Sequence, residues 1–272
     1  MNDQVGRGDA FLEGIPYPGV YVTDEDGIVV AKFFHDTYKK RDSPERLIDA
    51  ALGRLVLSED APSVRGGDEE VRISAFVHGG KGTIRQGILR ELIVRCELGE
   101  GIHIYGEPVP KGMIPTTLTV SGPPGLIVED PIFPPTQKLR LESVDMELPV
   151  WSGTVDIVVP FYAVGELASE TRPLDMEAIE IEIGLRYQAC DDVVCFPPKT
   201  EKLRLELKLD VIDVPRVGMH LGHGQREGSY DGSPHLKRLL LRKSRKNPMG
   251  LPRLVLKTIR LELAAKWRSL RR

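Results

Sequence analysis

The sequence lacks the features that mark a membrane-spanning or metal-binding chain. No stretch approaches the roughly 18 consecutive apolar residues that a transmembrane helix needs. Residues 1–9 have neither the basic start nor the apolar core of a secretory signal, so the sequence by itself favours a cytoplasmic protein. The 3 cysteines and 6 histidines show no zinc-type spacing. We therefore expect no metal and no cofactor.

Aromatic residues are also scarce, at 6% of the chain, whereas 27 glycines and 21 prolines are present. So many turn-forming residues favour a β architecture over a helical bundle. The 272 residues suffice for one large domain or two smaller ones, with a full hydrophobic core.

Acidic residues are nearly missing from residues 236–272, which hold thirteen Lys or Arg and a single acid, Glu262. Pro248 and Pro252 are expected to separate a long helix here from a shorter basic one near 235–246. The long helix is either solvated or docked on an anionic membrane surface, and nothing resembles a nucleic-acid-binding module. Its apolar residues recur at near-helical spacing: Leu254, Val255, Ile259, Leu263, Trp267 and Leu270.

The beginning of the chain predicts a hairpin followed by a helix. Two strand-like runs flank the turn signal of residues 24–27. Ser43 before Pro44 is the preferred arrangement at a helix N-terminus, and apolar residues then recur at helical spacing to Leu55. The polar, turn-rich residues 57–68 are expected to form a linker after a first segment, 1–56.

Residues 69–213 predict a mainly β domain. Gly and Pro clusters separate the candidate strands, and so many strands in this length favour an immunoglobulin-like β-sandwich. A flexible connector, 214–235, and the basic helical tail, 236–272, are expected to follow. The strand candidates are 70–77, 87–97, 102–106, 116–120, 154–164, 178–188 and 202–212.

The most informative stretch runs from Tyr187 to Pro198, because it places Cys190 and Cys195 close together before a double proline. In the chain-entropy model, closing so short a loop stabilises a fold by only about 2 kcal/mol. A bond that contributes so little is easily opened and closed, which favours a redox pair over a static disulfide or two reduced thiols. Cys96 alternates with apolar residues of one strand and is expected to be buried in the core.

The flanking residues make this region similar to the N-terminal domain of DsbD-type thiol:disulfide interchange proteins, over about residues 84–213. The similarity is carried by the segments 101–106, 115–120, 150–160, 187–190 and 195–198. It implies an immunoglobulin-like fold, a periplasmic setting, and a cysteine pair that exchanges disulfides with a thioredoxin-like or other dithiol protein.

The resemblance also assigns roles around the pair. It implies that Cys195 attacks and Cys190 resolves the mixed disulfide. It further implies a cap loop over the cysteines, for which Phe133 is the candidate shield. The acids between the cysteines, Asp191 and Asp192, are expected to raise the pKa of the thiols. The remaining flanking site residues are Tyr187, Gln188, Phe196 and Pro197.

Residues 14–55 resemble the C-terminal end of a redoxin of the alkyl hydroperoxide reductase/thiol-specific antioxidant kind. The resemblance lies in residues 14–24 and in the turn and strand that follow, with Pro18 at the position of the family's active-site proline. The thirteen residues before this segment contain no cysteine, so it is interpreted as a redoxin remnant without peroxidase activity. The alternative function for the whole chain is a non-catalytic β-sandwich binding module with an inert disulfide, whose basic tail docks on an anionic surface.

Overall fold

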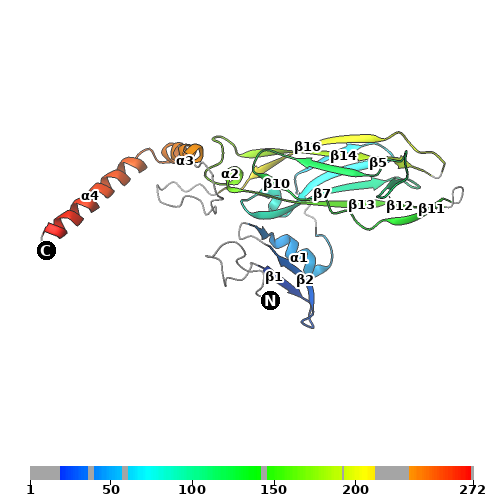
Figure 1. Ribbon diagram of the computed structural model, residues 1–272, viewed down its shortest axis with the longest axis horizontal. Helices are drawn as coiled ribbons and strands as arrows, with labels where there is room; N and C mark the ends of the chain where they lie inside the picture. Colours follow the sequence, from blue (N-terminus) through cyan, green and yellow to red (C-terminus); the bar gives the residue numbers. More distant parts are fainter. Residues whose placement is uncertain are drawn as a thin grey trace.

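The computed structural model describes residues 19–35, 40–56, 61–141, 146–191, 193–211 and 233–270. It is mainly β, with several antiparallel sheets and two helices at the C-terminal end, as the sequence predicted (Figure 1). Pro18, Asp192 and almost all of the expected connector 214–235 lie outside the described residues.

The largest sheet has the strand order β10-β13-β7-β5-β4, with β3 beside β7. Its central strands show the alternating or continuous apolar pattern of a half-buried or fully buried strand. In β13, for example, Val155, Ile157 and Val159 are all buried. The strands are β3 (Arg41–Asp42), β4 (Ser63–Gly67), β5 (Val71–His78), β7 (Ile88–Leu98), β10 (Leu126–Val128) and β13 (Thr154–Ala163).

A second sheet, of order β6-β16-β14-β9, lies over the first (Figure 1). The period-2 alternation of β14 and β16 turns one face of each strand inward. Side chains of both sheets, such as Ile157 and Ile181, belong to one buried hydrophobic cluster. The strands are β6 (Thr83–Ile84), β9 (Thr117–Ser121), β14 (Ala178–Tyr187) and β16 (Lys199–Leu209).

A third sheet, of order β11-β12-β8-β15, carries the cysteine pair. Its short strand β15 (Ala189–Cys190) pairs with β8 (His103–Tyr105), and β8 pairs with β12 (Met146–Ser152). The outer strand β11 (Gln137–Leu141) completes the sheet. A separate small cluster of buried residues joins Tyr105, Leu148, Val150 and Cys190.

The predicted hairpin and first helix are confirmed. Strands β1 (Gly19–Thr23) and β2 (Val29–Phe34) pair across the expected turn. Helix α1 (Pro44–Leu52) begins after Ser43, whose hydroxyl accepts a hydrogen bond from the Arg46 amide. The helix ends at Gly53, which adopts a left-handed φ of 63° that glycine tolerates without strain.

The expected linker 57–68 is not a linker throughout. Residues 63–67 form β4, which pairs with β5 at the edge of the main sheet. The sequence signal was misleading because Gly66 and Gly67 resemble a turn. Gly66 instead allows a close approach: a Cβ there would lie 2.7 Å from a Leu203 methyl group.

The helices at the C-terminal end match the two expected in the basic tail. Helix α3 spans Ser233–Lys246 and α4 spans Gly250–Leu270, with Pro248 between them as predicted. Pro252 lies inside the first turn of α4, a position where proline is tolerated. A short helix, α2 (Gly165–Ala168), and a 3₁₀ turn (Gly80–Gly82) complete the described elements. Among the described helices, none has the length and apolarity required to cross a membrane.

Candidate functional site

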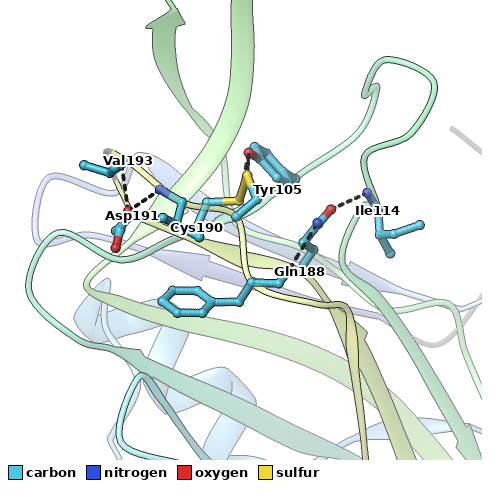
Figure 2. The surroundings of a disulfide bond; sticks show 9 residues. Tyr105, Ile114, Gln188, Cys190, Asp191 and Val193 are labelled. Carbon is cyan, nitrogen blue, oxygen red and sulfur yellow. Dashed lines mark hydrogen bonds between the residues drawn. A yellow bond between two sulfur atoms is a disulfide. The ribbon is translucent and has the colours of Figure 1, made fainter.

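Cys190 and Cys195 form a disulfide across a tight hairpin at the end of the third sheet (Figure 2). The Phe196 amide donates to the Ala189 carbonyl at 2.9 Å, and the Asp191 amide donates to the Val194 carbonyl at 3.0 Å. These bonds set the two cysteines opposite each other. Cys190 is 1% exposed, whereas Cys195 is exposed. The two cysteines of the disulfide therefore differ in exposure, with Cys195 on the surface and Cys190 buried.

The hydroxyl of Tyr105 lies against both sulfurs. It donates to Sγ of Cys190 at 3.1 Å and lies 3.3 Å from Sγ of Cys195 (Figure 2). Desolvation raises the pKa of Tyr105, so the phenol stays protonated and remains a donor at neutral pH. A donor placed here can stabilise negative charge on whichever sulfur becomes a thiolate.

The carboxylate of Asp191 is turned to the backbone of the hairpin loop. Its Oδ1 accepts hydrogen bonds from the amides of Val193, at 2.7 Å, and Val194, at 2.6 Å (Figure 2). Hydrogen bonds from the Val194 and Val193 amides hold the pKa of this carboxyl below its usual range. Asp191 thus has a second role that the sequence did not suggest, because it stabilises the loop that joins the cysteines.

Gln188 connects the cysteine hairpin to the segment that follows β8. Its Oε1 accepts a hydrogen bond from the Ile114 amide at 3.0 Å, and its Nε2 donates to the Phe196 carbonyl at 3.2 Å (Figure 2). The side chains of Val109 and Met113, from the same segment, pack against the small cluster that contains Cys190. This segment therefore covers the enclosed side of the disulfide.

A comparison with protein-family models gives a match for the part of the chain that carries this geometry. Residues 83–207 match the family described as "Thiol:disulfide interchange protein DsbD, N-terminal". The matched segment includes both cysteines, Tyr105 and Gln188. The DsbD N-terminal family implies thiol–disulfide exchange, and the disulfide that such exchange requires is present between Cys190 and Cys195.

Among the solved structures similar to this chain are three that contain DsbD or ScsB N-terminal domains. The N-terminal periplasmic domain of ScsB from Proteus mirabilis has 12% identity and a TM-score of 0.37, covering 55% of this chain and 52% of that one. The reduced DsbD N-terminal domain of Neisseria meningitidis has 19% identity and a TM-score of 0.29, covering 43% and 77%. The complex of the DsbD and PilB N-terminal domains from Neisseria meningitidis has 13% identity and a TM-score of 0.29, covering 52% and 81%.

The chain thus spans about half the length of the ScsB domain. No curated protein matches the chain. The DsbD match begins at residue 83, and no comparison supports the redoxin resemblance of residues 14–55.

The other predicted site residues lie in the main core or beside it. Tyr187 is 1% exposed in the main core, and no described residue hydrogen-bonds its hydroxyl. Phe196 is half-buried against the same core, and Pro197 is exposed beside it. Phe133, the expected shield of the cysteines, stacks on Trp151 with ring centroids 5.6 Å apart and packs against the main core. Tyr105 is an aromatic residue whose hydroxyl contacts both sulfurs.

Two residues at the site were missed by sequence reasoning, Tyr105 and His103. His103 is the cross-strand neighbour of Cys190, and its ring lies edge-on to Tyr105 with centroids 5.6 Å apart. Both belong to the segment 101–106, which carried part of the family resemblance. Their alternation along β8 places them on one face, so the signal was available once the pairing of β8 with β15 was known.

The third cysteine, Cys96, is fully buried in β7, as predicted. Burial raises the pKa of its thiol to about 12, so it is protonated at neutral pH and is a poor nucleophile.

One cluster of potential metal ligands occurs among the described residues, away from the cysteines. Asp49, His78 and Glu91 each place a ligand atom within 4.8 Å of the others. Residue spacing along the chain could not reveal this cluster, because the three residues come from α1, β5 and β7. Their atoms are engaged with protein partners: His78 Nε2 lies 2.5 Å from Asp49 Oδ2, and Arg46 Nε donates to Glu91 Oε1 at 2.6 Å. This cluster joins α1 to the main sheet.

Proposed function

We propose that this protein is a thiol–disulfide exchange protein that relays electrons through Cys190 and Cys195. The observation that carries the proposal is a disulfide between one buried and one exposed cysteine, inside the segment that matches the DsbD N-terminal family. The proposal extends to an immunoglobulin-like fold for residues 69–213, which is supported by the two sheets that share one core. We further propose a thioredoxin-like or other dithiol protein as the partner.

The proposed order of exchange follows from the unequal exposure of the two cysteines. In the reduced protein, the Cys195 thiolate attacks a disulfide sulfur of the partner, forms a mixed disulfide and displaces the partner's second sulfur as a thiolate. Cys190 then loses its proton and attacks Sγ of Cys195, which restores the Cys190–Cys195 disulfide and releases the partner as a dithiol. Two electrons pass to the partner, and the reverse sequence reduces this protein again.

The equilibrium test of the proposal is the reduction potential of the pair. A relay must be reducible by a dithiol partner, so we expect a potential above about −300 mV, whereas an inert structural disulfide has a lower one. Titration in glutathione and dithiothreitol buffers, read by alkylation of free thiols, measures it. A potential well below that value would show a static disulfide and would support the non-catalytic binding module instead.

Replacing Tyr105 with Phe is expected to slow exchange roughly tenfold, since a hydrogen bond to a charged group contributes about 1.5–3 kcal/mol. Phe keeps the ring beside His103 and removes only the hydroxyl. The thiol pKa should also rise, which the pH dependence of iodoacetamide alkylation of the reduced protein will report. Tyr21→Phe, in the β1–β2 hairpin, is the control. Equal rates for Tyr105→Phe and wild type would refute the role of the hydroxyl.

Two variants of Asp191 distinguish the effect of its charge from the effect of its hydrogen bonds to the loop. Asp191→Asn keeps an oxygen for the Val193 and Val194 amides but removes the charge, so alkylation of Cys195 at neutral pH should become several-fold faster. Asp191→Ala also removes the loop bonds and should lower the thermal midpoint.

The contribution of Asp191 to stability is expected to decrease in acid. Because the folded-state pKa of Asp191 lies below the ordinary value of 3.8, its contribution is present above that pH and is lost as the pH falls through the lower folded value. The stability difference between wild type and Asp191→Ala should therefore disappear in strong acid. A difference that persists unchanged there would contradict this account.

A further inference from the structure

Helix α4 is a long helix that extends away from the β domain (Figure 1). Its 21 residues correspond to about 31 Å at 1.5 Å per residue. Almost every residue of α4 whose burial the structure describes, 250–264, 266 and 267, is exposed. In proteins most helical stability comes from packing an apolar face rather than from intrinsic propensity. The exposure of α4 therefore indicates a surface that packs against something else.

An apolar strip and a row of basic residues lie side by side along α4, with Lys266 within the range of the apolar strip and the exposed Leu254 and Leu261 on the remaining side. The apolar strip is formed by residues spaced one, three or four positions apart, and each of these residues is 47% to 64% exposed. The basic residues Arg253, Lys257 and Arg260 follow the neighbouring side. Across residues 250–270 the sequence has five Lys or Arg and one acid. The apolar strip consists of Val255, Leu256, Ile259, Leu263 and Trp267.

We propose that α4 lies flat on an anionic lipid surface, with the apolar strip in the acyl boundary and the basic residues at the headgroups. A second copy of α4 would bury the strip but would bring two strongly basic helices together, which like-charge repulsion opposes. A nucleic acid would satisfy the charge and leave the apolar strip in water. An anionic lipid surface satisfies both, and a straight, projecting helix can reach a plane along its whole length.

The structure also shows how α4 would be attached to the β domain. Helix α3, directly before it, is held by Arg242, whose guanidinium donates to the carbonyls of Glu170, Arg172 and Pro173 at 3.0 to 3.1 Å. Lys243 Nζ lies 3.0 Å from both carboxylate oxygens of Glu170. Membrane contact through α4 would therefore carry the β domain, with its disulfide, to the surface.

The test is co-sedimentation of the full chain with phosphatidylcholine vesicles, with and without phosphatidylglycerol. We expect binding to the anionic vesicles only, with a blue shift of the Trp267 emission. Each of Ile259→Asp and Leu263→Asp should weaken binding at least about tenfold, because a buried aliphatic side chain is lost. Reversing Arg253, Lys257 and Arg260 to Glu together should weaken it at least about a hundredfold, since each basic residue contributes roughly fivefold.

Leu261→Asp is the matched control, because Leu261 is 57% exposed on a different side of the same helix. It should weaken binding only by the few-fold effect of its charge. Circular dichroism checks that each variant keeps its helix. Cys195→Ser should bind as wild type does, since the lipid contact does not depend on the disulfide.

Three outcomes would overturn the proposal. Absence of binding, or equal binding to vesicles without phosphatidylglycerol, would exclude an anionic lipid surface. Equal losses for Leu261→Asp and Ile259→Asp would exclude the apolar strip as the contact. A dimer in sedimentation equilibrium that Ile259→Asp disrupts in the absence of lipid would assign the strip to a second copy.

Discussion

Replacing Cys190 with serine is expected to leave a protein that forms a stable covalent complex with its partner, whereas replacing Cys195 is expected to prevent that complex. Cys195 is the exposed cysteine, so we expect its thiolate to reach a partner's disulfide. Cys190 is 1% exposed and can resolve the mixed disulfide only from inside the protein. Without Cys190 the mixed disulfide has no internal attacker and persists. Either substitution should abolish turnover completely.

The trapping experiment needs a partner that cannot resolve the complex either. A thioredoxin that keeps only its exposed active-site cysteine, activated as a mixed disulfide with thionitrobenzoate, meets this need. Attack by Cys195 releases the coloured thiolate, which gives the rate, and the complex is seen on a non-reducing gel. Cys96→Ala is the control, because that thiol is buried and should take no part.

Two outcomes of the trapping experiment would contradict the roles assigned to Cys190 and Cys195. If Cys195→Ser traps the partner and Cys190→Ser does not, the roles of the two cysteines are reversed. If neither variant reacts faster than a small-molecule thiol, the pair is not a site of exchange and the disulfide is structural.

Local signals in the sequence were enough for the elements that depend on few neighbours. The turn at residues 24–27 and the Ser43–Pro44 start of α1 were read correctly because each is decided within a few residues. The alternation of residues 203–209 predicted β16 for the same reason: it needs only one buried face. Each of these patterns lies within a few consecutive residues and does not depend on distant parts of the chain.

The sequence patterns did not predict strands that form only because a neighbouring strand pairs with them. Strand β4 contains two glycines, and β12 contains Pro149, so neither shows a strand pattern of its own. Each forms because a neighbouring strand supplies hydrogen bonds, β5 for β4 and both β11 and β8 for β12. The same limit hid the contact of Tyr105 with Cys190, which lies 85 residues further along the chain.

The first segment of the chain was predicted as a unit of its own, yet it is bonded into the β domain. Strand β3 pairs with β7 in parallel, at Arg41 opposite Ile88. Arg46 of α1 forms ion pairs with Asp42 and with Glu91, a residue of β7. His78 of β5 is 2.5 Å from Asp49 of α1. We therefore propose that α1 and β3 stabilise the β domain.

Arg46→Met tests this proposal, because it keeps most of the side-chain volume and removes the charge. Side chains of Asp42 and Glu91 are only 5% and 10% exposed, and both would lose a cationic partner. Removing one partner from a buried ion pair destabilises a protein by about 3–5 kcal/mol. We expect a loss of that order in the free energy of unfolding, with the denaturant midpoint read from the emission of Trp151 in the core.

Arg72→Met provides the comparison, because its partner Glu97 lies on β7, the strand that also carries Glu91. Arg72 on β5 pairs with Glu97 on β7 at 3.2 Å, but their side chains are 70% and 47% exposed. Solvent screens such a pair, so its loss should change the free energy of unfolding by no more than about 1 kcal/mol. Arg46 pairs with two buried carboxylates and Arg72 with one exposed carboxylate, so a difference of this size reflects both the burial and the number of ion pairs. If the two variants unfold at the same denaturant concentration, α1 rests on the sheet without stabilising it, and residues 1–56 behave as the separate unit that the sequence suggested.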